Sequence, residues 1–188
     1  LALCLLALAL VLALAGCGGG SRPTGIRAAE TPADDVAEYQ PRWRSHTVDS
    51  TQYRKVFLAG TIDMGRSSDW QAALVARFRD SIGGRWLFFN PRRREFHASP
   101  AEMEYQVAWE LAHLEAADLI VMNLLGDSRS PISLLEMGLY ARSGKLFVAC
   151  SPDYYRYDNV RITCRRYGVP LYDSLTALLD DLPQQSDE

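Results

Sequence analysis

Two residue types that build disulfide frameworks and metal sites are scarce in this chain of 188 residues, which has four cysteines and three histidines. Four cysteines are too few for a disulfide scaffold. No histidine lies in a metal-ligand spacing, so we expect no metal site. The chain also lacks an excess of positive charge, because its formal net charge is -3. Without a basic surface to displace counterions, we expect no nucleic-acid partner.

The first 16 residues contain no charged side chain. This run is shorter than the roughly 20 residues of a membrane-spanning helix and is typical of the apolar core of a secretory signal. It ends in Leu14-Ala15-Gly16-Cys17, which resembles a bacterial lipobox. Such signals are cleaved before the cysteine, whose sulfur receives a diacylglycerol. The alternatives are an uncleaved N-terminal anchor and an upstream reading-frame error.

The lipobox resemblance implies a protein of the bacterial cell envelope, attached to the membrane through Cys17. Gly18 follows the cysteine, and this favours the outer membrane, facing the periplasm. Residues 17–52 have no sustained apolar period, so we interpret them as the lipidated cysteine and a flexible tether. The globular domain is then expected at residues 53–183, with a polar tail at 184–188.

Apolar runs and helical patterns alternate along the expected domain. Short apolar runs predict strands at 56–60, 86–89, 119–122, 146–149 and 169–171. Helices are expected at 69–82, 100–116, 130–144, 159–167 and 173–181. Such alternation predicts an α/β fold, with a parallel sheet of about five strands and helices on both faces. Ligands of such sheets bind at the carboxyl ends of the strands, so the loops at 60–69, 90–99, 123–132 and 150–159 are candidates.

Glu136 is the most informative residue of these segments, because Leu134, Leu135, Met137 and Leu139 surround it in the sequence. A carboxylate among apolar neighbours is partly desolvated, and this can make it a nucleophile. The alternative is an ordinary surface glutamate of an amphipathic helix. Glu110 lies in the preceding helix, and we expect it to line the same cleft.

Two other segments have features of binding sites. The loop from Gly60 to Gly65 is neither a dinucleotide fingerprint nor a P-loop, but its small residues allow a ligand to approach the backbone closely. The basic cluster Arg92-Arg93-Arg94 can hold an anionic group bidentately. A solvated turn is the alternative for this cluster.

A series of motifs resembles the nucleoside 2-deoxyribosyltransferase-like family across the globular part. The motifs are Val56-Phe57-Leu58-Ala59-Gly60-Thr61-Ile62, Asp69-Trp70-Gln71, Asn90-Pro91-Arg92-Arg93, Gln106-Val107-Ala108-Trp109-Glu110-Leu111, Ala117-Asp118, Ser130-Pro131-Ile132-Ser133-Leu134-Leu135-Glu136-Met137-Gly138, and Asn159-Val160 with Cys164. The resemblance implies a flavodoxin-like sheet and cleavage of the N-glycosidic bond of a nucleoside or nucleotide. It assigns Glu136 as the nucleophile that attacks the anomeric carbon.

The same resemblance implies the roles of other residues. Glu110 would protonate the leaving base or orient Glu136, and Ser130 would help to hold a phosphate. The substrate-binding residues implied are Gly60, Thr61, Asp63, Asn90, Arg92, Asp118, Ser130, Ser133 and Asn159. The family chemistry needs no cofactor, and its enzymes often form homo-oligomers.

Several functions remain open from the sequence. Water as the acceptor would make the protein a hydrolase, and a second base would make it a transferase. The alternatives are a catalytically silent nucleotide-binding or sensing lipoprotein, an NAD-cleaving glycohydrolase, and a domain that only binds a protein partner. Cys150 and Cys164 either form a disulfide in an oxidising compartment or are two small buried residues.

Overall fold

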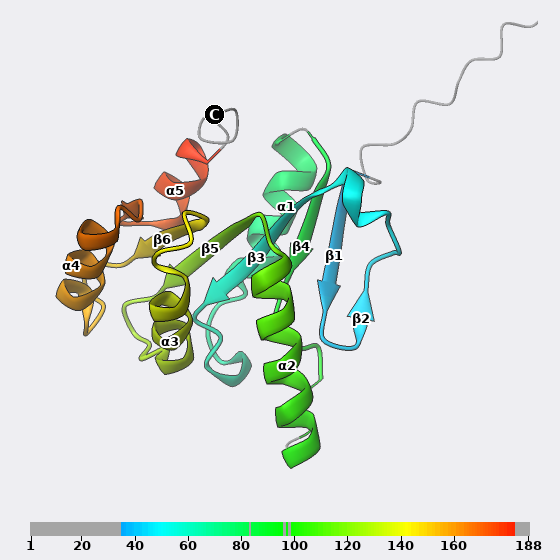
Figure 1. Ribbon diagram of the computed structural model, residues 1–188, viewed down its shortest axis with the longest axis horizontal. Coiled ribbons are helices and arrows are strands. Elements are labelled where there is room, and N and C mark those ends of the chain that lie inside the picture. Colours follow the sequence, from blue (N-terminus) through cyan, green and yellow to red (C-terminus); the bar gives the residue numbers. More distant parts are fainter. Residues whose placement is uncertain (1–34, 83, 96, 98, 183–188) are drawn as a thin grey trace, which may run out of the picture. The chain divides into compact units, whose positions relative to one another are not determined.

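The computed structural model describes residues 35–82, 84–95, 97 and 99–182, and they form one seven-stranded sheet with helices on both faces (Figure 1). The signal, Cys17, Gly18, the start of the expected tether and the polar tail lie outside the described residues. The strands are β1 (Val36–Gln40), β2 (Trp43–Arg44), β3 (Arg54–Gly60), β4 (Trp86–Phe89), β5 (Leu119–Leu124), β6 (Leu146–Cys150) and β7 (Leu171–Tyr172). The helices are α1 (Trp70–Ser81), α2 (Pro100–Ala116), α3 (Pro131–Tyr140), α4 (Tyr157–Tyr167) and α5 (Leu175–Asp181), with short 3-10 turns at η2 (Ser50–Gln52) and η3 (Asp63–Gly65). None of these helices is long and apolar enough to cross a membrane.

The strand order is β2-β1-β4-β3-β5-β6-β7, and every pairing except β1 with β2 is parallel. The five strands from β3 to β7 follow the flavodoxin-like order, in which the first strand lies between the second and the third. The predicted α/β fold is therefore confirmed. Its switch point lies between β3 and β5, and ligands of such sheets bind at this crevice.

The expected number of strands was too low, because residues assigned to the tether form β1 and β2. β1 pairs with β4 along Val36 to Tyr39 at the edge of the parallel part of the sheet. Val36 and Ala37 are buried against the core. The chain then turns at Arg42, whose φ is 63°, and returns as β2. This turn has no glycine, so it lacks the usual sequence signal of a hairpin.

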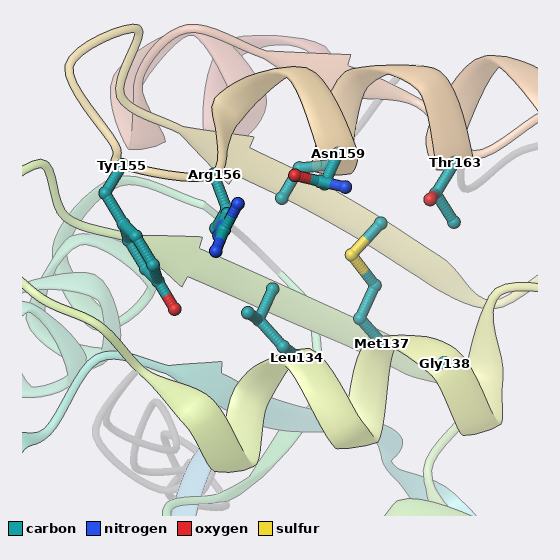
Figure 2. A pocket seen from close by; sticks show the side chains of 8 residues that line it. Leu134, Met137, Gly138, Tyr155, Arg156, Asn159 and Thr163 are labelled. Atoms are coloured by element: carbon teal, nitrogen blue, oxygen red, sulfur yellow. The ribbon is translucent and has the colours of Figure 1, made fainter.

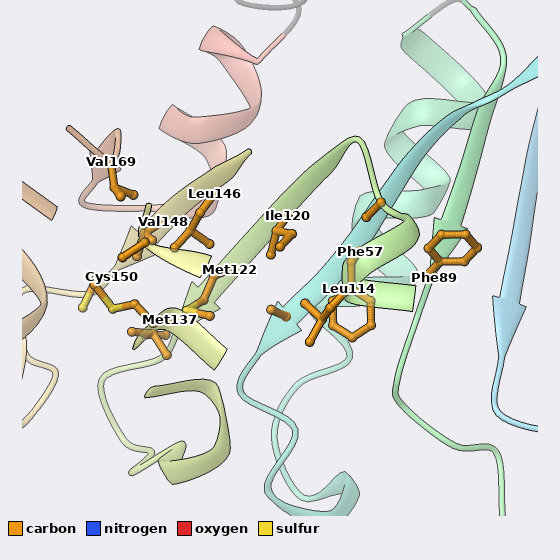
Figure 3. Close-up of a cluster of buried hydrophobic side chains, with 14 of the residues drawn as sticks. Phe57, Phe89, Leu114, Ile120, Met122, Met137, Leu146, Val148, Cys150 and Val169 are labelled. Atoms are coloured by element: carbon orange, nitrogen blue, oxygen red, sulfur yellow. The ribbon is translucent and has the colours of Figure 1, made fainter. Parts of the chain in front are cut away.

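Two hydrophobic cores hold the helices on opposite faces of the sheet. On one face, Leu114 of α2, Met137 of α3 and Cys164 of α4 pack on a cluster that includes Phe57 and Ile120 (Figure 3). On the other face, side chains of α1 and α5 pack on the sheet, among them Trp70, Leu74, Phe78, Leu178 and Leu179. The helices α2 and α3 therefore share one face of the sheet, and this brings Glu110 and Glu136 to the same side.

Candidate active site

Glu136 is the only ionisable side chain of α3 apart from the terminal Tyr140, and it is buried, with 8% of its surface exposed. The helix begins at Pro131, one residue after Ser130, and Glu136 lies on its inner side next to Met137. Burial raises the pKa of Glu136 to about 8, and the negative charge of Glu110 contributes to the same rise. The carboxyl group is thus protonated at neutral pH in the free protein and ionises readily just above it.

Glu110 of α2 is the second carboxyl group of this region. Gln106, one turn earlier, donates a hydrogen bond from Nε2 to Glu110 Oε1 at 2.7 Å. The Gln106 amide is itself fixed, because Nε2 also donates to the Pro91 carbonyl at 3.1 Å and Oε1 accepts from Arg93. Burial raises the pKa of Glu110, while Gln106 and the charge of Arg93 oppose that rise. The structure therefore brings together two carboxyl groups that interact electrostatically, with different hydrogen-bond environments.

A cluster of buried hydroxyl groups lies where β3 and β5 end. Thr61 Oγ1 and Ser130 Oγ are 2.7 Å apart, and Ser130 Oγ is 2.8 Å from Ser128 Oγ. Ser128 Oγ donates to Asp63 Oδ1 at 2.9 Å. The backbone N–H of Leu125 donates to Thr61 Oγ1 at 3.1 Å and joins the two loops. Four side chains from two loops are thus fixed at the switch point of the sheet.

Backbone conformations in this cluster are unusual for residues with side chains. Asp63, Met64 and Ser130 have φ values of 49°, 54° and 40°. Each such conformation costs of order 1 kcal/mol or more and is often found at functional sites. Ser133 is buried as well and lies one helical turn after Ser130 and one turn before Glu136. Two hydroxyl groups and one carboxyl group therefore follow each other along the buried side of α3. Glu136 lies roughly 9 Å along the helix axis from Ser130, given a rise of about 1.5 Å per residue.

Ser128 was not among the residues predicted from the sequence, although its loop was. It is buried, and its hydroxyl group bridges Ser130 and Asp63. No motif marks it. The signal that could have identified it is the polar run from Gly126 to Ser130 at the end of a buried strand.

Gly60 has a structural role at the junction of β3 and β5, and its contact with a ligand stays a prediction. A Cβ atom at this position would lie 2.2 Å from the Asn123 carbonyl oxygen, and φ is 123°. The backbone of β5 therefore occupies the space that the glycine leaves open. Thr61 N–H donates to the same Asn123 oxygen at 2.9 Å, and this holds the ends of β3 and β5 together.

Asn90 and Arg92 are buried and make their hydrogen bonds within the protein. Asn90 Nδ2 donates to Glu38 Oε1 at 2.7 Å, and Asn90 Oδ1 accepts from the Arg92 N–H at 3.0 Å. The Arg92 guanidinium donates to Gln71 Oε1 at 3.1 Å and to Ser67 Oγ at 2.9 Å. These contacts brace the loop between β3 and α1, and a direct contact of Asn90 or Arg92 with substrate stays a prediction.

The other arginines of the basic cluster are also engaged. Arg93 Nη1 lies 2.8 Å from Glu102 Oε2 in an ion pair whose arginine side chain is buried. The Arg94 guanidinium lies over the ring of Trp43, 3.7 Å from its centroid. The three arginines thus have partners within the protein, although Arg94 is exposed to solvent, and the binding of an anion by this cluster stays a prediction.

Asp118 is not part of this site. It precedes β5 at the amino end of the strand, and its Oδ2 accepts from the Lys55 N–H at 2.8 Å. The six residues of β5 span about 20 Å and separate Asp118 from the carboxyl ends of the strands. The prediction that Asp118 binds substrate was wrong, because a residue that precedes a strand lies at its amino end, whereas ligands of such sheets bind at the carboxyl ends.

A pocket of about 340 Å³ lies between α3 and α4 (Figure 2). Its lining consists of Leu134, Met137, Gly138, Tyr155, Arg156, Asn159, Val160 and Thr163. Asn159, a predicted binding residue, therefore faces α3 from α4. Glu136 is not part of the lining and interacts with Glu110 of α2 instead, so the structure does not bring Asn159 and Glu136 together.

The two buried cysteines of the described chain are free thiols. Burial raises the pKa of Cys150 to about 12 and that of Cys164 to about 11. Both belong to the core shared by α3 and α4, so they are packed as small buried residues. No group of three or more metal-ligating side chains occurs among the residues that the structure describes.

The fold and this arrangement define a flavodoxin-like α/β protein in which a buried carboxyl group, Glu136, interacts with a half-buried one, Glu110, near the switch point of the sheet. The chain belongs to the nucleoside 2-deoxyribosyltransferase-like family, whose model matches residues 53–154. The match includes Glu110, Glu136 and the hydroxyl cluster. Comparison with curated proteins gives no match.

Solved structures support the fold alone. The crystal structure of a conserved protein from Enterococcus faecalis V583 is similar, with a TM-score of 0.50 and 14% sequence identity. The similarity covers 71% of this chain and 99% of that chain. The two chains thus have similar folds although their sequences are only 14% identical.

Proposed function

We propose that this protein cleaves the N-glycosidic bond of a nucleoside or nucleotide through a glycosyl ester on Glu136. Membership in the nucleoside 2-deoxyribosyltransferase-like family supports N-glycosyl transfer as the reaction class. The observation that carries the assignment to Glu136 is its position. It is a buried carboxyl group on the helix that begins at the switch-point loop, beside a second carboxyl group.

The proposed reaction proceeds in two displacements. An ionised Glu136 oxygen forms a bond to the anomeric carbon while the bond from that carbon to the base nitrogen breaks, and its electron pair leaves with the base. The proton that Glu136 holds in the free protein passes to Glu110, and Glu110 donates it to the departing base. Water, or the N–H nitrogen of a second base, then attacks the same carbon, gives its proton to the ionised Glu110 and releases the Glu136 carboxylate.

The electrostatics of the carboxyl pair fit this division of roles. Two adjacent carboxyl groups in a buried site do not both ionise readily, so they hold one proton between them at neutral pH. Transfer of that proton to the base leaves Glu136 ionised and able to bond the sugar. A developing positive charge on the sugar would stabilise the carboxylate, because desolvated opposite charges attract strongly.

The hydroxyl cluster would hold the sugar or its phosphate. Thr61, Ser128 and Ser130 form one hydrogen-bonded chain at the ends of β3 and β5. Ser133 lies between this chain and Glu136. A ligand seated on the cluster would therefore extend along α3 toward the carboxyl pair.

The test is the release of free base, measured by chromatography, from a panel of nucleosides, nucleoside monophosphates and NAD. We expect wild-type protein to release base from at least one nucleoside or monophosphate. Glu136→Gln should abolish release, because an amide cannot form the glycosyl ester. Glu110→Gln should slow it by about 10²–10⁴-fold, the usual contribution of a positioned acid.

Glu104→Gln is the matched control, since Glu104 is an exposed carboxylate of α2. This variant should release base at the wild-type rate. Release from NAD alone would favour the glycohydrolase alternative, and no release from any compound would favour a silent binding protein. Either result, or full activity in a folded Glu136→Gln protein, would contradict the proposal.

A further inference from the structure

Glu110 lies at one end of a continuous chain of polar contacts that begins in the hairpin of β1 and β2. Arg42, at the turn of this hairpin, donates from Nη2 to Glu102 Oε1 at 2.7 Å. Glu102 Oε2 accepts from Arg93 Nη1 at 2.8 Å, and Arg93 Nε donates to Gln106 Oε1. Gln106 Nε2 in turn donates to Glu110 Oε1 at 2.7 Å. We define the Glu110 relay by its members Glu102, Arg93 and Gln106.

The direction of hydrogen bonding in the Glu110 relay is fixed at Gln106. Its Nε2 atom has two acceptors, the Pro91 carbonyl at 3.1 Å and Glu110, whereas its Oε1 atom accepts from Arg93. A reversed amide would place its oxygen against two acceptors and its NH2 group against a donor, so all three hydrogen bonds would be lost. Gln106 therefore donates to Glu110. A carboxylate accepts such a bond more strongly than a carboxylic acid does, so this contact favours the ionised form of Glu110.

The charge of Arg93 acts on Glu110 in the same direction. The Arg93 side chain is only 8% exposed, so its attraction for Glu110 is screened less than that of a surface pair. Glu102 lies between Arg42 and Arg93, and hydrogen bonds from these two side chains lower its pKa, so it stays ionised and holds Arg93 in place. The hairpin, which precedes the residues that match the family model, thus supports one end of the relay.

The other carboxyl group of the pair has no such support. Glu136 makes no side-chain hydrogen bond to any residue in the described part of the chain, and burial and the charge of Glu110 raise its pKa to about 8. Two further titratable groups lie about one turn beyond the carboxyl groups, and both are neutral at pH 7. Burial lowers the pKa of His113 on α2 and raises that of Tyr140 on α3. The relay is therefore the feature that distinguishes the two carboxyl groups.

We propose that the Glu110 relay positions the proton shared by the two carboxyl groups, so that Glu136 holds it in the free protein and Glu110 stays ionised. The consequence of this placement rests on the proposed function. The nucleophile is uncharged until a substrate binds, and Glu110 is a stronger acid toward the departing base once the proton reaches it. Because Glu110 Oε1 accepts from Gln106, Oε2 is the oxygen that receives the proton and passes it on.

The test is a pH titration of the two carboxyl carbons by NMR, on the full chain with isotope-labelled glutamate in a non-ionic detergent. Glu110→Gln and Glu136→Gln assign the two resonances, and we expect wild-type Glu110 to titrate below Glu136. Gln106→Met keeps a side chain of similar length but removes the N–H donor. Glu110 should then titrate at a higher pH and Glu136 at a lower pH. The ratio of molecules protonated on Glu110 to those protonated on Glu136 should rise by at least about tenfold, the effect of one hydrogen bond to a charged group.

Arg93→Met tests the charged part of the relay and should move both titrations in the same directions. Arg79→Met is the matched control, since Arg79 is an exposed arginine of α1 on the other face of the sheet, and it should titrate like wild type. Unchanged titration of Glu110 in folded Gln106→Met and Arg93→Met proteins would overturn the proposal, as would a wild-type Glu110 that titrates above Glu136. These titrations need no substrate, so their outcome is separate from the release of base that tests the proposed function.

Discussion

Glu136 combines two properties that oppose each other, namely burial and a titratable charge. Its pKa of about 8 in the folded protein lies well above the ordinary value of 4.5, mainly because burial disfavours the anion. The folded state therefore binds this proton more tightly than the unfolded chain does. The carboxyl group destabilises the fold once it ionises, which is a common property of reactive groups.

We predict that Glu136→Gln stabilises the protein in a pH-dependent manner. The free energy of unfolding of the wild type should fall as the pH rises from about 5 to about 8, and the amide removes this loss. The gain should be small near pH 5 and on the order of 3 kcal/mol near pH 8. Denaturant melts at both pH values measure it. Glu104→Gln is the control, and an equal gain at both pH values would contradict the assigned pKa.

Single residues also show where sequence reasoning succeeds and where it stops. Glu136 was identifiable because its apolar neighbours imply burial, which is a local property. The position of Asp118 was identifiable as well, because it precedes the strand expected at 119–122 and so lies at the amino end of that strand, but the family resemblance implied a binding role that this position does not allow. Arg92 was recognised as a candidate anion ligand, but its partners Gln71 and Ser67 lie more than 20 residues away in the chain. Such long-range contacts leave no local pattern.

At the scale of elements, local signals predicted the helices well. Ser99 and Pro100 predicted the start of α2, and Ser99 Oγ indeed accepts from the Glu102 N–H at 3.1 Å. The strand β4 was predicted with its observed bounds. β1 was missed because its five residues lack a clear apolar period. Its pairing with β4 depends on backbone hydrogen bonds that any sequence can form.

The junction of β3 and β5 gives an element-scale prediction. Gly60→Ala should destabilise the fold by at least about 2 kcal/mol, because the new Cβ would clash with the Asn123 backbone at a positive φ. Gly138→Ala is the control, since its Cβ would meet nothing within 4 Å and α3 gains a better helix former. It should stabilise by about 0.5–1 kcal/mol. Equal thermal melts for Gly60→Ala and wild type would contradict the assigned role of Gly60.

At the scale of the whole molecule, residues 1–34 lie outside the described structure, and the expected lipid anchor belongs to them. We propose that Cys17 is the lipidated N-terminus of the mature protein. Mass spectrometry of protein extracted from the membranes of a bacterial expression host should find a cleaved, acylated Cys17. Cys17→Ser should leave the chain unprocessed and unacylated. An acyl-free, full-length mature wild-type protein would contradict the anchor.

The central claim of this account is that Glu136 forms a covalent bond with the sugar of a nucleoside. Acid quenching during turnover, followed by peptide mass spectrometry, tests it most directly. We predict that the peptide containing Glu136 carries one glycosyl group, and that Glu136→Gln protein carries none under the same conditions. Release of base by the wild type with no glycosyl peptide, together with undiminished release by a folded Glu136→Gln protein, would contradict the claim.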